Sequence, residues 1–138
     1  MSLAIEQRDL EGIVVLDLKG QLTIGDGDIA LRDRLTLLGH SGKYRVVLDL
    51  SGVDYIDSSG LGTLVFALTR MVKHHGRLAL SNVNQAHLKL FLLTKLALAF
   101  EFFHDDHDAV NSFYPDRAIQ HFDILEFVEQ QEAMAAPR

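Results

Sequence analysis

The stretch Asp57–Gly62 constrains this chain more than any other, because it follows an apolar run, Val46–Leu50, and precedes a segment with helical periodicity. This order indicates a strand that ends, a tight turn and a helix that begins. Ser58 stands where a helix N-cap is expected, and Gly60 and Gly62 remove side-chain bulk so that a backbone or a ligand can approach. A helix N-terminus also offers unpaired N–H groups and a partial positive charge. The stretch therefore predicts either a simple helix cap or a place for a phosphate.

Composition limits the classes of protein to which the chain can belong. It has 138 residues, of which 48% are hydrophobic, so we expect one domain with a sizeable core. The net charge of −6 argues against a nucleic-acid partner and against docking on anionic lipid. No apolar run is long enough to span a membrane, the N-terminus does not read as a signal peptide, and there is no cysteine. We expect a cytoplasmic protein without a membrane partner.

Strand and helix patterns alternate along the chain. Strands are expected at about 3–8, 13–18, 45–50, 77–81 and 100–103. Helices are expected after the loop at 25–28, after Ser58, after Asn84, after Asp106 or Asp108, and from 118 to about 131. The first two strands are close enough for a hairpin, whereas the later ones need parallel crossovers. We expect an α/β fold with a mixed sheet of four to five strands, helices packed on it and an extra C-terminal helix.

The helix after Ser58 has the clearest amphipathic pattern. Its apolar stripe comprises Leu61, Leu64, Val65, Leu68 and Val72. Phe66 falls roughly opposite this stripe, so we expect either a solvent-facing ring that can anchor a partner or a ring covered by the C-terminal helix. Gly76 is the expected left-handed residue after the helix end.

The motifs resemble those of the STAS-domain family, and more narrowly those of bacterial anti-sigma factor antagonists. The resemblance rests on Gly20–Leu22 after the second strand, on Val47–Ser51 in the central strand, and on Val53–Gly62. It covers about residues 3–113. We therefore expect a STAS domain at 1–113 and a C-terminal helical extension at 114–138.

The resemblance implies a function. Ser58 would accept a phosphate from an anti-sigma factor that is itself an ATP-dependent serine kinase. The unphosphorylated chain would bind that anti-sigma factor and free a sigma factor, and a serine phosphatase would restore binding after phosphorylation. The chain itself would not be an enzyme and would need no cofactor.

The expected partner-binding residues surround the motif. They are Thr23, Asp57, Ser58, Ser59, Gly60, Leu61, Gly62 and Phe66. Thr23 departs from the family, which commonly has aspartate at this position. The change keeps a hydrogen-bonding group and loses a charge.

Other polar clusters favour structural interpretations. The run His104–His107 is expected to be a polar turn, because no second ligand cluster stands at metal-binding spacing. Asp49, Asp54 and Asp57 could form an acid/base or magnesium cluster, but no partner base or phosphate-binding lysine lies in the motif. The Gly-x-Ser-x-Gly elbow of serine hydrolases is absent around Ser58.

Two interpretations of function and two of the C-terminal helix stay open. The chain is either the phosphorylation-controlled antagonist or a non-catalytic STAS assembly module of a transport or signalling complex. The apolar residues Phe122, Leu125, Phe127 and Val128 must be buried somewhere. We expect them to pack on this domain, with a symmetric homodimer as the alternative.

Overall fold

The computed structural model describes residues 2–135 of the 138-residue chain. Five strands alternate with helices, as the sequence pattern predicts. The strands are β1 (Leu3–Leu10), β2 (Ile13–Leu22), β3 (Arg45–Ile56), β4 (Arg77–Ser81) and β5 (Glu101–Phe103). The helices are α1 (Asp26–His40), α2 (Ser58–Lys73), α3 (Gln85–Leu93), the short 3-10 helix η1 (Leu96–Leu98), α4 (Asp106–Asn111) and α5 (Ile124–Ala135).

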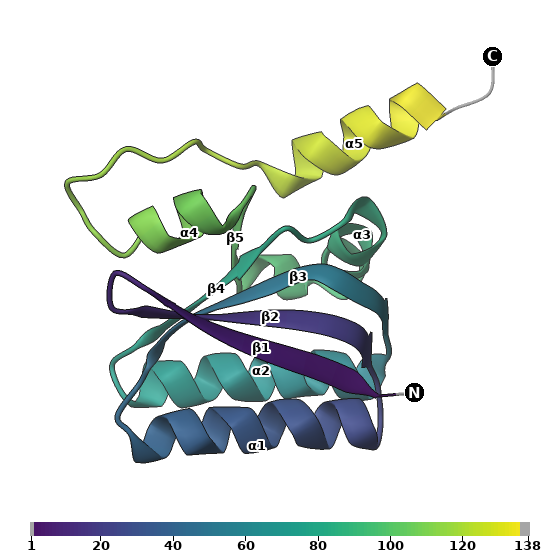
Figure 1. Ribbon diagram of the computed structural model, residues 1–138. Coiled ribbons are helices and arrows are strands. Elements are labelled where there is room, and N and C mark those ends of the chain that lie inside the picture. The colour runs from purple at the N-terminus through teal and green to yellow at the C-terminus, as the bar shows by residue number, and fades with distance from the viewer. Residues whose placement is uncertain (1, 136–138) are drawn as a thin grey trace.

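The strands form one mixed sheet in the order β1-β2-β3-β4-β5. The β1–β2 pair is an antiparallel hairpin, and each later neighbour is parallel. Helices α1 and α2 lie side by side on one face of the sheet, and α4 lies on the other (Figure 1). Because β2 and β3 are parallel, their carboxyl ends meet at the same edge, where the turn into α2 begins.

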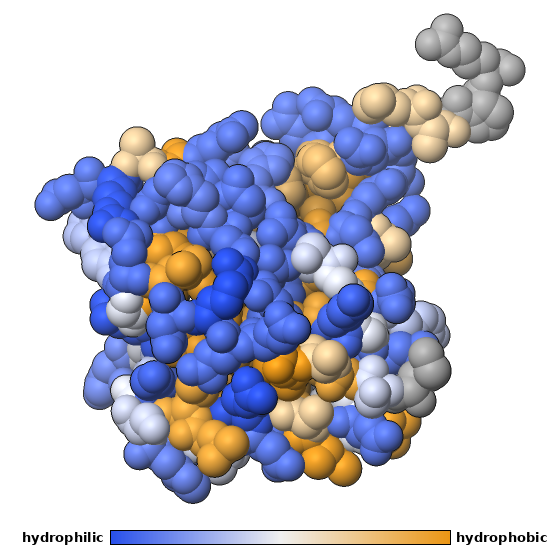
Figure 2. All heavy atoms as spheres, viewed as in Figure 1, coloured by the Kyte–Doolittle hydropathy of each residue, from blue (hydrophilic) through white to orange (hydrophobic). Residues whose placement is uncertain are grey.

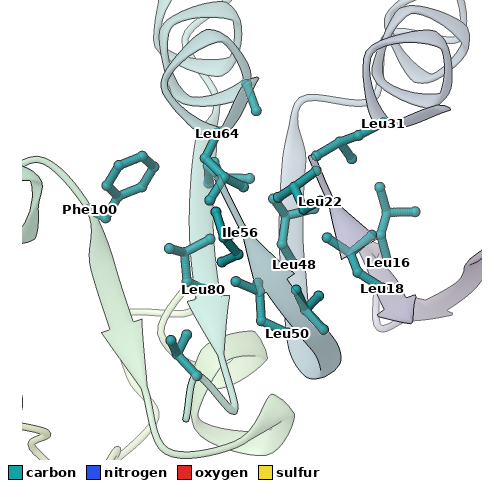
Figure 3. Close-up of a cluster of buried hydrophobic side chains, with 14 of the residues drawn as sticks. Leu16, Leu18, Leu22, Leu31, Leu48, Leu50, Ile56, Leu64, Leu80 and Phe100 are labelled. Carbon is teal, nitrogen blue, oxygen red and sulfur yellow. The ribbon is translucent and has the colours of Figure 1, made fainter. Parts of the chain in front are cut away.

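The central strand β3 is buried on both faces, which explains its continuous apolar run. Leu48 points into the larger core, together with Leu31 from α1 and Leu64 from α2 (Figure 3). Val47, the residue before Leu48, belongs to a smaller core under α4. The sheet is therefore closed by helices where the site-bearing strand runs through it.

The C-terminal helix packs on its own domain. Its contacts with another element are mainly with α3, and they include an ion pair between Lys89 and Glu132 at 3.0 Å. Val128 is only 3% exposed, and the rings of Phe122 and Phe127 pack edge-to-face on each other and both contact the ring of His104. Leu125, which the sequence pattern placed with these buried residues, is 54% exposed. The helix thus packs on its own domain as expected, with three of the four apolar residues facing it.

Several local predictions were wrong in detail. Val72 is exposed, because the buried stripe of α2 continues through Ala67 and Met71 instead. The left-handed residue after α2 is His75, whereas Gly76 is needed because a Cβ there would overlap the carbonyl oxygen of Tyr44.

The start of α4 also differs from the prediction. The cap of α4 is Asp105, one residue before the expected range, because its carboxylate accepts from the N–H of Asp108 at 2.9 Å.

In the view of Figure 2, hydrophobic side chains are exposed in separate patches within a mostly hydrophilic surface.

Candidate functional site

The turn into α2 is held by the side chain of Asp57. Its Oδ1 accepts from the N–H of Gly60 at 2.8 Å, and its Oδ2 accepts from the N–H of Ile24 at 3.0 Å. Asp57 is in the extended conformation and is therefore the N-cap of α2. The expectation that Ser58 is the cap was wrong: Ser58 is the first residue of the helix.

The two serines of the motif differ in accessibility. Ser58 is exposed at the first position of α2, whereas Ser59 is half-buried and its carbonyl accepts from the hydroxyl of Thr63 at 3.1 Å. Because Asp57 supplies the cap, the Ser58 hydroxyl is not needed to start the helix. An exposed hydroxyl beside the unpaired N–H groups of a helix start is chemically suited to accept and hold a phosphate.

The two glycines of the motif have different reasons to be glycine. A Cβ on Gly60 would overlap the carbonyl oxygen of Leu22, so this glycine lets α2 begin directly against the end of β2. A Cβ on Gly62 would meet nothing within 4 Å, and Gly62 is exposed. Leu61, between them, is buried in the main core and fixes the rotation of the helix. Only Gly62 therefore leaves room for another molecule.

The loop between β2 and α1 lies beside this helix start. Thr23 is half-buried, and its carbonyl accepts from the N–H of Asp28 at 3.0 Å, which shapes the entry into α1. Ile24 is 75% exposed and Tyr55, at the end of β3, is 59% exposed. Two apolar side chains thus flank the motif in solvent. Neither side chain was among the partner-binding residues predicted from the sequence, and the burial pattern of β3 around Tyr55 does not follow strict alternation.

A polar contact joins α1 to the first turns of α2. The carboxylate of Asp28 accepts from the hydroxyl of Thr63 and from the guanidinium of Arg32, the latter at 2.7 Å. The Arg32 guanidinium lies over the ring of Phe66, 4.5 Å from its centroid. Phe66 is therefore half-buried beside α1, neither fully solvent-facing nor covered by α5. Thr63 is fully buried at this contact with α1.

Both carboxylates beside the motif are held in the charged form. The backbone N–H groups of Ile24 and Gly60 keep the pKa of the Asp57 carboxyl below its ordinary value. The Thr63 hydroxyl, followed by the Arg32 guanidinium, does the same for the pKa of Asp28. The candidate site therefore carries fixed negative charge next to Ser58 before any modification.

Asp49 does not gather with Asp57. It lies within 4.8 Å of Asp17 and Asp106 on the sheet face near α4, where it accepts from the N–H of Ser51 and the amide of Asn82. Arg8 bridges the other two carboxylates. These polar contacts connect the β1–β2 hairpin to α4, and the cluster is separate from the Ser58 motif.

A protein-family comparison agrees with this geometry. The family model described as "Mlab, STAS domain" matches residues 6–98, which include most of β1, all of β2, β3 and β4, and the whole Ser58 motif. The chain belongs to the STAS-domain family. The match ends before α4 and α5, so the helical extension lies outside it.

Relatives and solved structures place this STAS domain among known examples. An anti-sigma-B factor antagonist of Bacillus subtilis (strain 168) is 27% identical over 96 residues, which cover 70% of this chain and 86% of that protein. The Bacillus cell fate determinant SpoIIAA in its phosphorylated form shares the fold, with a TM-score of 0.62 and 18% identity over 81% of this chain and 99% of that one. A part of the murine Solute Carrier 26 family member A9 anion transporter also shares it, with a TM-score of 0.59 and 20% identity over 75% of this chain and 18% of the transporter.

One finding concerns membranes. Within residues 2–135, no helix has the length and apolarity needed to cross a bilayer.

Proposed function

We propose that this STAS domain is a phosphorylation-regulated binding module that acts in the cytoplasm as an anti-sigma factor antagonist. Unphosphorylated at Ser58, it binds an anti-sigma factor with serine kinase activity and so frees a sigma factor. Phosphorylation of Ser58 by that kinase ends the interaction, and a serine phosphatase restores it. The domain performs no chemistry of its own and needs no cofactor.

The observation that carries this proposal is that Asp57 caps α2, whereas Ser58 is exposed and takes no part in the cap. Asp57 caps the helix and ties down the neighbouring loop, so the exposed Ser58 hydroxyl can be modified without loss of the cap. The Bacillus subtilis relative is named an anti-sigma-B factor antagonist, and a solved neighbour of the same fold is described in a phosphorylated form. Both support the same role for this chain.

The phosphate acts at the partner surface and leaves the fold intact. It adds about −1.5 to −2 charges at neutral pH. The start of α2 tolerates this charge, since its N–H groups favour an anion. At an interface the same charge must lose water next to the fixed carboxylate of Asp57, which raises the free energy of the complex.

The partner surface that we propose consists of the Asp57–Gly62 motif with Thr23 and Phe66, together with two additional side chains. Ile24, whose N–H binds Asp57, and Tyr55, near the end of β3, are exposed apolar groups near the motif, and exposed Gly62 lets a partner backbone approach α2. Phe66 extends the surface along α2, with the Arg32 guanidinium on one side of its ring. Aromatic groups partly buried in this way are frequent anchors of protein interfaces.

The decisive experiment is a phosphorylation assay with matched variants. The wild-type chain, Ser58→Ala and Ser59→Ala are each incubated with ATP and a serine-kinase anti-sigma factor from the same organism, and the products are mapped by mass spectrometry. We expect one phosphate on wild type and on Ser59→Ala, located at Ser58, and none on Ser58→Ala. Phosphate on Ser59 alone, or on neither serine, contradicts the proposal.

A second candidate function is a STAS assembly module that is never phosphorylated. It is favoured by Thr23 in place of the usual aspartate and by the domain within the anion transporter, which shares the fold. Under this alternative the wild-type chain stays unmodified in the kinase assay, and a Ser58→Asp change leaves binding to its complex largely intact.

A further inference from the structure

Three connections meet at the end of the sheet opposite Ser58 and enclose a pocket of about 400 Å³. They are the β1–β2 hairpin, the loop between α1 and β3, and the turn between α2 and β4, which lie together at the left of Figure 1. Gly12 and Gly42 have positive φ values of 86° and 68°, as tight turns require, and they place no side chain over the opening. The pocket is therefore a product of three turns that are far apart in the sequence.

The pocket wall is cationic, although the whole chain carries a net charge of −6. Lys43 and Arg45 contribute permanent positive charges, and His74 and His75 add two imidazoles. Among the described residues that line the wall, Asp9 alone contributes a carboxylate. Within residues 2–135, neither Lys43 nor Arg45 forms an ion pair.

Favourable interaction with a helix dipole does not account for the positions of Lys43 and Arg45. The favourable effect of a cation on a helix C-terminus falls off beyond the last turn, which here contains His40 for α1 and Arg70 and Lys73 for α2. Lys43 and Arg45 come later, at the approach to β3 and at its first residue. Nearby helix-end carbonyls already have backbone partners, because Leu38 accepts from the N–H of Lys43 at 2.9 Å and Met71 accepts from the N–H of Gly76 at 2.7 Å.

One wall of the pocket is rigid. The rings of Tyr44 and His74 stack with centroids 4.2 Å apart and an angle of 8° between their planes. The Tyr44 hydroxyl also donates to the carbonyl of Gly39 at 3.2 Å. Lys43 and Arg45 line the same pocket as this stacked pair, and the Arg45 guanidinium lies 3.5 Å from the carbonyl oxygen of Gly12. There Arg45 can pair with two oxygens of a phosphate and Lys43 can act as a point charge.

We propose that this pocket binds a small soluble polyanion that carries phosphate groups. Its volume lies in the range of small-molecule sites, and cations with few apolar groups fit a phosphate-bearing ligand better than an apolar one. Binding at this end is separate from the Ser58 surface, so this proposal does not depend on the proposed function.

Pyrophosphate is the probe for the test, with the full chain observed by NMR of backbone amides and by thermal melting. We expect pyrophosphate to shift the amide signals of Gly12, Gly42 and Gly76 and to raise the melting temperature, because a ligand that binds only the folded state stabilises it. Lys43→Gln with Arg45→Gln should weaken binding at least about tenfold. The matched control is Lys19→Gln, which removes an exposed cation outside the pocket and should leave binding unchanged.

The melting temperature of each variant without pyrophosphate shows that it is folded, and Ser58→Ala should bind pyrophosphate as wild type does. Three results would overturn the proposal. These are no shift at the pocket amides, an equal shift with sodium chloride of matched ionic strength, and unchanged binding by the Lys43→Gln, Arg45→Gln variant.

Discussion

The Oδ2 atom of Asp57 lies 3.0 Å from the backbone nitrogen of Ile24, and this hydrogen bond joins the β2–α1 loop to the start of α2. The other carboxylate oxygen caps the helix through Gly60. One side chain therefore fixes two of the segments that surround Ser58. The candidate partner surface is consequently preorganised, which lowers the entropy lost on binding.

Asp57→Ala should lower the melting temperature at neutral pH and have little effect in acid. The pKa of the Asp57 carboxyl is lowered by the N–H groups of Ile24 and Gly60, so its stabilising effect is present above its ordinary value of 3.8 and is lost as the pH falls through the lower folded value. Thermal melts of wild type and variant across this range measure the difference. Asp116→Ala, in an exposed loop, is the control. A difference that grows in acid would contradict the assignment.

Ser58→Asp should weaken binding to the anti-sigma factor while the melting temperature stays nearly unchanged. The added charge sits at a helix N-terminus, which tolerates it, but it must be desolvated in the complex. Isothermal titration calorimetry measures the affinity, and Ser58→Ala should retain it. A large fall in melting temperature would mean that folding, and not recognition, is the switch.

The two motif glycines should respond in opposite ways to the same change. Gly60→Ala forces a methyl group into the carbonyl of Leu22 and should cost at least about 2 kcal/mol of unfolding free energy. Gly62→Ala adds a methyl in open space within a helix and should stabilise the fold by up to about 1 kcal/mol. Urea denaturation gives both values. Equal losses would show that Gly62 is also close-packed.

Phe66→Ala should weaken binding to the anti-sigma factor, because it removes the aromatic group that extends the surface from Ser58 along α2. Val72→Ala, which truncates an exposed residue further along the same helix, should not. Calorimetric titration of both variants provides the comparison, and circular dichroism confirms that both are folded. If Phe66→Ala binds as tightly as wild type, the anchor proposal is wrong.

The attachment of α5 can be tested with two matched charges. Val128→Asp places a carboxylate in the contact with the core and should cost about 2 to 4 kcal/mol or detach the helix. Leu125→Asp, on the exposed side of the same helix, should change stability by less than about 0.5 kcal/mol. Thermal melts compare the two, and deletion of residues 114–138 should lower the melting temperature without a change in the number of subunits. A dimer that dissociates on deletion would instead favour the homodimer.

The arrangement of strands and helices could be predicted from local patterns. The hairpin, the buried run of β3 and the helix after Ser58 all follow from periodicity and from turn residues, because these depend on neighbours in the sequence. The same holds for Asn84, whose side chain accepts from the N–H of His87 at 2.8 Å as the cap of α3. The division at 113 and 114 stays a prediction, although α5 packs as a separate helix after a stretch without regular structure.

By itself, the sequence determined that Ser58 stands at the start of a helix beside a glycine that permits close approach. Only the tertiary structure decided that Asp57 fixes two segments at once, because its Oδ1 caps α2 through Gly60 while its Oδ2 accepts from the N–H of Ile24, 33 residues earlier in the chain. Contacts between distant segments also explain why Thr63 is fully buried and Phe66 half-buried, since both face α1. Helical periodicity identifies the sides of a helix, but the rotation and position of its neighbours depend on packing among distant segments, which no local pattern records.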